Sequence, residues 1–265
     1  MVFDVLFSGF PCKSSRGFLG WSSCVLIRGE RNGLFDTGGF GDRPELIRRL
    51  QDRGIRLTDI DYVILSHMHF DHAANVSMFP QATVYLHEAE VQHAKAARFD
   101  DFALCTEVLE MLQQGSRLKL LTGADGVVEG HRWMHTPGHT PGGISIILKG
   151  EDGANWVAAG DAVKNLHEAE TGDVWMSMDR RASQESIQKV LSIADYIIPG
   201  HDRQIRIQHT EGECRLSAKS DSEITIEVAG DVPTPFKVSD VDGGLQSKTR
   251  RLLLQLHPDQ GESDF

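Results

Sequence analysis

A short apolar run followed by a cluster of histidines constrains this chain more than any other feature of its sequence. Residues 61–65 carry tyrosine, valine, isoleucine and leucine in succession, which predicts a short buried β-strand. Residues 66–72 then read SHMHFDH, with three histidines and one carboxylate. Neutral imidazole nitrogens and carboxylate oxygens are the ligands that zinc and related divalent ions prefer. The chain must therefore fold so that the end of a buried strand reaches a metal site.

The spacing inside this segment predicts two groups of ligands. Side chains two residues apart point the same way in an extended chain, so we expect His67 and His69 to bind one ion together. Asp71 and His72 lie beyond the end of the strand, where the chain can turn toward a second ion. The alternative is a chance cluster of surface histidines. It is disfavoured because ligand-type residues also follow other apolar runs further along the chain.

Three downstream segments place such side chains after apolar runs. Residues 134–143 read MHTPGHTPGG, and their prolines and glycines exclude a helix and predict a rigid loop centred on His139. Asp161 follows the run at 156–159, and its two oxygens can bridge two ions. His201 follows the run at 195–198. The candidate ligands are His67, His69, Asp71, His72, His139, Asp161 and His201. Seven such residues suffice for two metal sites that share one carboxylate.

Three further polar residues have more than one interpretation. Asp36 ends an apolar run and precedes two glycines, which is equally typical of a site-facing loop and of a simple turn or helix cap. His87 ends a predicted strand at 82–86, where packing or helix capping is favoured over metal binding. His93 lies on a predicted helix at 88–97, where an exposed surface position is favoured.

Composition sets the broad class of protein. The chain has 265 residues, 40% of them hydrophobic and 25% charged, which permits a sizeable core in one large domain or two small ones. A net charge of −11 disfavours nucleic acid as the main partner. Four widely spaced cysteines without a CxxC pair predict reduced thiols. No signal peptide and no membrane-spanning run is evident, so we expect a cytoplasmic protein that does not bind membranes.

The chain divides into a main domain and an extension. We predict that residues 1–207 form the main domain, with helices at 44–53, 88–97, 103–112 and 182–193. The loop at 9–20 is predicted to overhang the site, and the polar connection at 164–181 to form part of the substrate wall. Residues 208–265 form an acidic extension with a strand at 224–228 and a disordered end at 258–265.

These motifs resemble the metallo-β-lactamase superfamily. The HxHxDH segment, the TPGHT loop, the Gly-Asp pair ending in Asp161 and the Pro-Gly-His ending in His201 occur in the family order, and Asp36 matches an early strand-end aspartate. The likeness covers residues 25–201 and excludes the extension. In layout the chain is most similar to the small single-domain metallo-β-lactamase domain-containing proteins and to lactonase-like members.

The resemblance implies an α/β fold, an αββα sandwich of two mixed β-sheets flanked by helices, with residues 1–207 as the hydrolase domain. It implies that three histidines hold one ion, that three other residues hold the second, and that one aspartate bridges them. The first ion would be held by His67, His69 and His139, and the second by Asp71, His72 and His201. The bridging residue would be Asp161. Asp36 would orient a ligand histidine. Zinc is the first expectation, and iron or manganese also suits these ligands.

By the same resemblance, the chain is expected to be a binuclear hydrolase of a small-molecule ester, thioester or lactone. Asp71 is the predicted catalytic residue, which orients a hydroxide and shuttles a proton. Asp161, and not a cysteine, occupies the bridging position, which disfavours a periplasmic β-lactamase. The loop after His139 lacks the residues with which glyoxalase II binds glutathione, which disfavours glutathione thioesters as substrates. Tyr196 lies in a predicted core strand, so the catalytic tyrosine of acyl-homoserine lactonases has no clear counterpart.

Two other functions remain as alternatives. A metal-dependent nuclease or phosphodiesterase needs a basic groove, for which Arg180, Arg181, Arg203 and Arg206 are the only local candidates. A non-catalytic metal-binding interaction protein would use the acidic extension as its contact surface, but the complete ligand set disfavours it. We also expect a homodimer.

Overall fold

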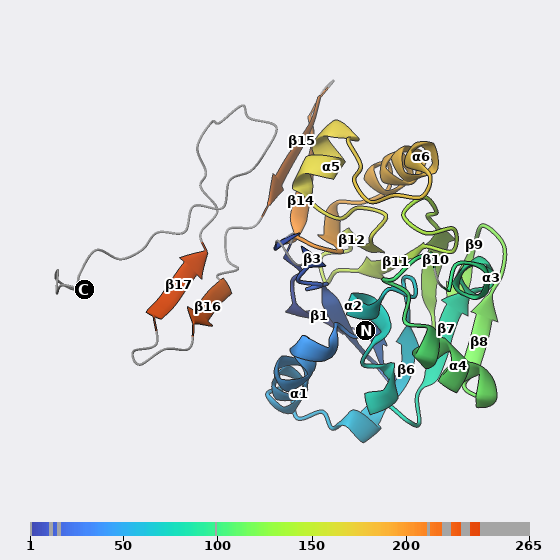
Figure 1. Ribbon diagram of the computed structural model, residues 1–265. Coiled ribbons are helices and arrows are strands. Elements are labelled where there is room, and N and C mark those ends of the chain that lie inside the picture. The colour runs from blue at the N-terminus through green and yellow to red at the C-terminus, as the bar shows by residue number, and fades with distance from the viewer. Residues whose placement is uncertain are drawn as a thin grey trace, which may run out of the picture. The chain divides into compact units, whose positions relative to one another are not determined.

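The computed structural model describes residues 2–10, 13–14, 17–98, 100–210, 213–218, 224–228 and 234–238. The chain forms two compact units, Met1–Lys219 and Ser220–Phe265 (Figure 1). The first unit extends beyond residue 207, where we placed the end of the hydrolase domain. The segment 258–265, which we predicted to be disordered, lies outside the described residues.

The first sheet of the main unit has six strands in the order β1-β4-β5-β6-β7-β8. Its strands are β1 (Val2–Phe7), β4 (Cys24–Arg28), β5 (Asn32–Phe35), β6 (Ile60–Ile64), β7 (Thr83–His87) and β8 (Leu118–Leu121). The pairs from β1 to β5 are antiparallel, whereas those from β5 to β8 are parallel. A separate short hairpin pairs β2 (Lys13–Ser14) with β3 (Gly17–Phe18).

The second sheet has seven strands in the order β15-β14-β13-β12-β11-β10-β9. Its strands are β9 (Asp125–Val128), β10 (His131–His135), β11 (Ile144–Lys149), β12 (Asn155–Gly160), β13 (Tyr196–Pro199), β14 (Ile205–Thr210) and β15 (Glu213–Ala218). Only the β12–β13 pair is parallel. Both sheets are therefore mixed, as predicted.

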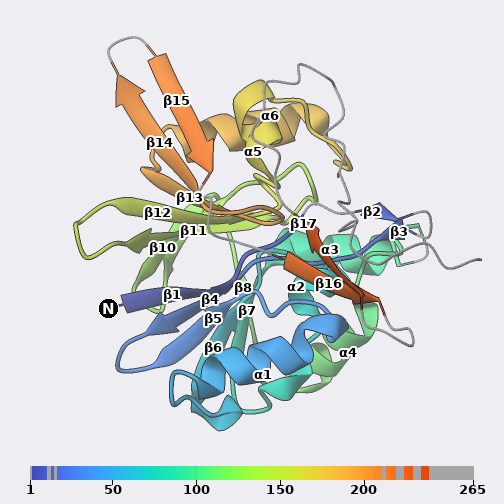
Figure 2. The same cartoon turned by 90° about the vertical axis from the view of Figure 1, so that its left-hand side faces the viewer.

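Helices cover the outer face of each sheet (Figure 2). Those beside the first sheet are η1 (Phe40–Asp42), α1 (Arg43–Gln51), η2 (Leu57–Asp59), α2 (Phe70–Ala73), η3 (Val76–Met78), α3 (Glu88–Ala96) and α4 (Thr106–Gln114). Those beside the second are α5 (Leu166–Thr171) and α6 (Arg180–Leu191). The predicted αββα sandwich is confirmed. Among helices in the described ranges, none has the length and apolar character needed to cross a membrane.

Three apolar cores follow from the alternation of side chains along the strands. On β6, Tyr62 and Ile64 face the second sheet, while Val63 faces the helices of the first layer. On β12, Ala158 faces the first sheet, while Val157 packs toward α5 and α6. Strands buried on both faces account for the unbroken apolar runs in the sequence. Because β6, β12 and β13 end at the same edge of the sandwich, the segments that follow them meet there.

The helix α5 of the main unit was not predicted. The connection at 164–181, which we expected to form part of the substrate wall, contains α5. Asn165 caps this helix by accepting a hydrogen bond from the Glu168 backbone N–H at 3.0 Å. The helix ends at Gly172, whose φ of +65° is left-handed. Its six residues are too few to show a clear helical period in the sequence.

The second unit contains the antiparallel pair β16 (Ile224–Val228) and β17 (Thr234–Val238). Ile224 lies opposite Val238 at one end of the ladder.

Candidate metal centre

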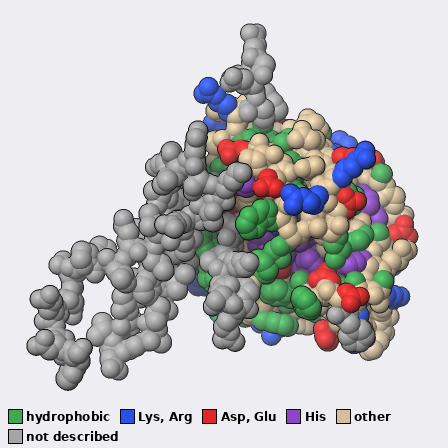
Figure 3. Space-filling view, turned by 45° about the horizontal axis from the view of Figure 1, so that its top comes forward, with side chains coloured by type: hydrophobic (Ala, Val, Ile, Leu, Met, Phe, Trp, Pro, Cys, Tyr) green, Lys and Arg blue, Asp and Glu red, His purple; other side chains and the backbone are tan. Residues whose placement is uncertain are grey.

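The structure brings all seven predicted ligands together at the common edge of the two sheets. Their ligand atoms form overlapping groups in which all atoms lie within 4.8 Å of one another. These groups are His67, His69 and His139; His67, His72 and Asp161; and Asp71, His72 and His201. Six of the seven residues are buried, and His201 is partly exposed. Figure 3 shows histidine side chains at the surface of this unit beside hydrophobic ones.

Each ligand is placed by the end of a regular element. His67 and His69 follow β6 in extended backbone, and Asp71 and His72 lie on the single turn of α2 that begins directly afterwards. His139 lies in the loop between β10 and β11, which is closed by a hydrogen bond from Thr136 N–H to the Gly143 carbonyl at 2.8 Å. Asp161 and His201 follow the parallel strands β12 and β13.

The three histidines of the first group, which we call the three-histidine set (His67, His69 and His139), are each held by one ring nitrogen. His67 Nδ1 lies 2.8 Å from Ser66 Oγ. His69 Nε2 lies 3.1 Å from Asp101 Oδ2. His139 Nδ1 lies 2.6 Å from the carbonyl oxygen of Met176. The other ring nitrogens face inward, and His139 Nε2 is 2.9 Å from His69 Nδ1. Contacts of this kind fix the tautomer and direction of a ligand histidine.

The other ligands, which we call the carboxylate set (Asp71, His72 and His201), follow the same rule. His72 Nδ1 lies 2.8 Å from Asp36 Oδ2, and His201 Nδ1 lies 3.0 Å from the carbonyl oxygen of Trp21. The Nε2 atoms of both histidines therefore face Asp71 Oδ2, at 3.9 Å from His72 and 3.4 Å from His201.

Asp161 lies between the two sets and offers one oxygen to each. Its Oδ2 is 3.1 Å from His139 Nε2. Its Oδ1 is 3.2 Å from both His72 Nε2 and His201 Nε2. This position requires a glycine beside it, because a Cβ on Gly200 would lie 2.1 Å from Asp161 Oδ1.

Several inward-facing atoms lack a hydrogen bond among the described residues, and they test whether a metal fits. His67 Nε2, His72 Nε2 and Asp161 Oδ1 are buried without a hydrogen bond. Leaving such an atom unsatisfied costs about 1–3 kcal/mol. Nitrogen and oxygen atoms about 3.3 Å apart are what a tetrahedral zinc site requires, given bonds of about 2.0–2.1 Å. The observed separations bracket that value, so the residues fit divalent metal ions.

Electrostatics differ between the two sets. Burial lowers the pKa of His67 and of His139 well below the usual histidine value, so both are neutral and suited to bind a cation. Burial also opposes the charged form of His72, but Asp71, Asp36 and Asp161 outweigh it and raise its pKa. Asp161 likewise outweighs burial and raises the pKa of His201.

Asp36 belongs to the site and is not a simple turn residue. Its Oδ1 accepts a hydrogen bond from Ser66 N–H and its Oδ2 accepts one from Ser66 Oγ, both at 2.7 Å. The Ser66 hydroxyl is thereby free to accept from His67 Nδ1, so Asp36 supports both His72 directly and His67 through one intermediate. Asp36 is only 1% exposed and has a φ of +56°, which is unusual for a residue other than glycine.

The predictions for His87 and His93 had different outcomes. His87 caps α3 by accepting from Ala89 N–H at 3.2 Å, which confirms the capping prediction. The prediction that His93 is an exposed surface residue is wrong. Its side chain is only 8% exposed, and its Nε2 lies 3.2 Å from Asp101 Oδ2, the same oxygen that contacts His69. Asp101 has no motif in the sequence and was missed.

The part of the 9–20 loop that the structure describes contacts the site. A Cβ on Gly20 would lie 2.4 Å from the Phe70 ring, so the backbone packs directly on α2. The Ser22 hydroxyl donates to the carbonyl oxygen of Asp71. Cys24 and Cys105 are buried free thiols, and the side chains of the other two cysteines are not among those described.

Comparison with known proteins places these features in a family. The family model of the metallo-beta-lactamase superfamily matches residues 19–203. Metallo-beta-lactamase domain-containing protein 1 of Xenopus laevis is 32% identical over 70% of this chain and 72% of that protein. An N-acyl homoserine lactonase from a Bacillus species is 26% identical over 68% of this chain and 72% of that protein.

A solved structure supports the fold. The dizinc quorum-quenching lactonase AidC superposes with a TM-score of 0.62 at 18% identity, covering 76% of this chain and 80% of that one. We conclude that this chain belongs to the metallo-β-lactamase superfamily and is a metallohydrolase.

Proposed function

We propose that this protein is a binuclear metal-dependent hydrolase of a small-molecule ester, thioester or lactone. The observation that carries the proposal is the gathering of five inward histidine nitrogens around Asp161, whose two oxygens contact those of His72, His139 and His201, with every outward ring nitrogen already bonded. This arrangement supports a site for two cations. The match to an N-acyl homoserine lactonase supports a carbonyl substrate.

Each ligand set would bind a different ion. The three-histidine set would hold one ion, the carboxylate set the other, and Asp161 would contact both. Two bound divalent ions would supply water with a lowered pKa and polarisation of the substrate carbonyl. Zinc is our first choice because four of the seven inward ligands are imidazole Nε2 atoms, and the AidC structure is described as dizinc.

Asp71 is the residue we assign to proton transfer. Its Oδ2 lies 3.4 Å from His201 Nε2 and 3.9 Å from His72 Nε2, so it borders the ligands of the second ion. During hydrolysis, the water oxygen forms a bond to the carbonyl carbon and the bond to the leaving oxygen or sulfur breaks. Asp71 would take the proton released by the water and pass it to that leaving atom.

An apolar segment beside His139 supports an apolar group on the substrate. Trp175, Met176 and Met178 are 60%, 51% and 50% exposed. The backbone carbonyl of Met176 is the group that holds His139, and Met178 N–H bonds to the His139 carbonyl. These exposed side chains are therefore attached to the segment that orients a ligand. The prediction that the 164–181 connection lines the substrate site is part of this proposal.

The arginines considered for a nuclease do not support a polyanionic substrate. Arg180 lies 2.8 Å from Asp173, and Arg181 lies 3.0 Å from Glu185. Arg203 Nε lies 3.9 Å from Asp202 Oδ1, so three of the four arginines already have a carboxylate partner. A small uncharged substrate agrees better with these pairs and with the net charge of −11.

The positions of the tyrosines indicate whether one of them can act on the substrate carbonyl. The chain has three. Tyr196 stacks on Trp156 with ring centroids 4.1 Å apart, Tyr85 donates to Glu129 at 2.6 Å, and Tyr62 is buried between the sheets. All three are engaged within or beside strands. A lactone would therefore be hydrolysed here without a tyrosine at the substrate carbonyl. For this reason thioesters and simple esters are proposed as substrates equally with lactones.

The test combines metal analysis with a substrate panel. Purified protein is stripped with a chelator, reconstituted with zinc, and assayed on a lactone, a thioester, a cephalosporin and a phosphodiester. We expect about two ions per chain and turnover of the lactone, the thioester or both, as for other binuclear sites. Failure to bind metal after reconstitution would refute the proposal. Turnover of the phosphodiester alone would replace it with the nuclease alternative.

A further inference from the structure

A buried carboxylate that the proposed mechanism does not use lies behind the three-histidine set. Glu90 is on α3 and is 0% exposed. Glutamate is almost never fully buried unless its charge has partners, because removing a carboxylate from water is expensive. The partners of Glu90 therefore show what it does.

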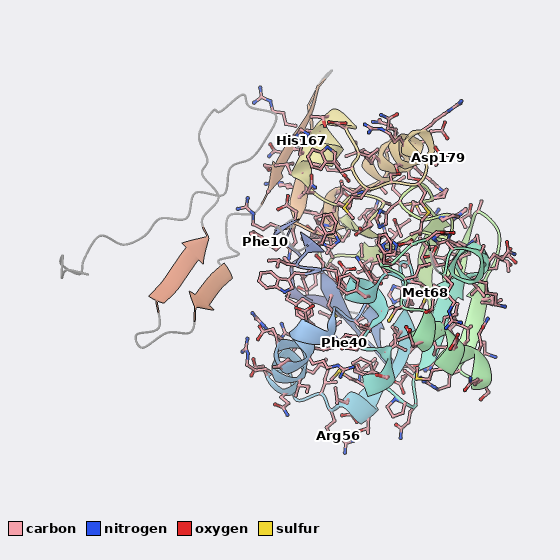
Figure 4. All side chains as sticks on the ribbon, in the orientation of Figure 1. Phe10, Phe40, Arg56, Met68, His167 and Asp179 are labelled. Carbon is pink, nitrogen blue, oxygen red and sulfur yellow. The ribbon has the colours of Figure 1, made fainter. Side chains whose placement is uncertain are left out.

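Each oxygen of Glu90 accepts a hydrogen bond from a different ligand-bearing segment. Oε1 accepts from Met68 N–H at 3.0 Å, and Met68, labelled in Figure 4, is the residue between His67 and His69. Oε2 accepts from Gly142 N–H at 3.0 Å, and Gly142 belongs to the loop that carries His139. The carboxylate thus joins the two segments that supply the three-histidine set.

The surroundings leave little freedom for either segment to move. A Cβ on Gly142 would lie 2.2 Å from the backbone nitrogen of Glu90, so the loop touches the first turn of α3 directly. Met68 is 0% exposed, and its carbonyl accepts from Cys105 N–H at 2.8 Å. The Glu90 carboxylate therefore lies between two closely packed segments and bonds to both.

We propose that Glu90 is a positioning residue for the metal held by the three-histidine set. Its two oxygens fix the spacing of His67 and His69 relative to His139. Hydrogen bonds from N–H groups to a carboxylate are stronger than those to a neutral acceptor, so this spacing is held firmly. The inference rests on the proposed function, since it presumes an ion in that set.

The first test is Glu90→Gln, which keeps the size of the side chain but places an amide NH₂ against one of the two N–H donors. Glu88→Gln, the same change at a partly exposed position on the same helix, is the matched control. Cobalt affinities of the two sites are measured by competition with a chromophoric chelator, together with the visible spectrum of bound cobalt. We expect one of the two dissociation constants to rise about 10–100-fold in Glu90→Gln, the range typical of lost support around a ligand. Glu88→Gln should leave both constants unchanged.

A second variant and a second background make the test specific. Glu90→Asp keeps the charge but shortens the side chain, so it reaches only one segment and should weaken the same site by a smaller factor. In a His201→Ala background, where only the three-histidine set is complete, Glu90→Gln must still weaken cobalt binding and alter its spectrum.

Two results would overturn the inference. One is unchanged affinity of both sites in Glu90→Gln, and the other is an equal loss at both sites, which would indicate a general loss of structure. If the unmodified protein itself bound no cobalt, the proposed function would fail instead, so the two failures are distinguishable.

Discussion

The two ligand sets use similar residues but are supported in different ways. The three-histidine set contains only imidazoles, and burial keeps His67 and His139 neutral. Its support comes from Asp101, the Met176 carbonyl and Ser66. The carboxylate set contains Asp71 itself, and neighbouring carboxylates raise the pKa of both its histidines against the effect of burial.

This difference indicates how each set tolerates the absence of a metal. Neutral imidazoles in the first set leave nitrogen lone pairs unsatisfied, as the orphan His67 Nε2 shows. In the second set a proton on His72 or His201 pairs with Asp71 or Asp161 and replaces part of the missing charge. The shared Asp161 is the side chain that offers one oxygen to each set.

The largest expected effect therefore follows from Asp161→Ala. Removing the carboxylate between the sets takes a ligand from each and leaves His72 and His201 without their neighbour. We expect metal content to fall below one ion per chain and kcat/KM to fall about 10³-fold or more, equivalent to about 4 kcal/mol or more. Asp52→Ala, at an exposed ion pair with Arg48 at the C-terminal end of α1, is the control. Retention of two ions with full activity would show that Asp161 does not bridge.

Asp36→Asn should have the next largest effect and should lower the metal affinities of the two sets unequally. The amide keeps the shape but replaces one acceptor oxygen with a donor, which disturbs His72 and the Ser66 hydroxyl together. We expect metal affinity of the carboxylate set to weaken about 10–100-fold, with a smaller loss in the other set. Metal titration of the variant measures this. A greater loss of metal affinity in the three-histidine set would mean that Asp36 acts mainly through Ser66 on His67.

Asp101→Asn should affect the three-histidine set alone. Asp101 contacts His69 from outside any motif, and its side chain is 14% exposed, so solvent can partly replace it. We expect about a tenfold loss of affinity in this set, the lower end of the usual range, with no change at the other. His93→Gln, which removes the second histidine on the same oxygen, should have a smaller effect in the same titration. Equal weakening of both sets would contradict the separation of their supports.

The smallest effect is expected outside both sets, at Trp175→Ala. The backbone N–H of Trp175 donates to Glu168 and is retained in alanine, so the segment that holds His139 stays in place. We expect KM for an apolar acyl substrate to rise about tenfold, from the loss of about 1.4 kcal/mol of apolar contact, with kcat and metal content unchanged. Val127→Ala, an exposed apolar position on β9, is the control. A fall in kcat at constant KM would assign Trp175 a role in placing His139.

Sequence reasoning was most successful where the ligands follow buried strands. The apolar run before His67 and the one before Asp161 could be recognised as strands, and both strands end at the edge where the site lies. It was less successful where short elements or isolated residues matter. The helix α5 has only six residues, and His93 was assigned to the surface because its partner Asp101 is outside the helix.

The sequence by itself determined the fold class and the seven ligand-type residues. The fold class followed from the resemblance of its motifs to a known family, and the seven ligand-type residues from local spacing and apolar runs that are visible along the chain. Only the tertiary structure decided which ring nitrogen of each histidine faces inward and which residues support it. Glu90 lies 22 residues from Met68 and 52 from Gly142, and Asp101 lies 32 from His69. Contacts over such separations exist only after α3 and the loop around Asp101 pack against the ends of the strands, so no local pattern predicts them.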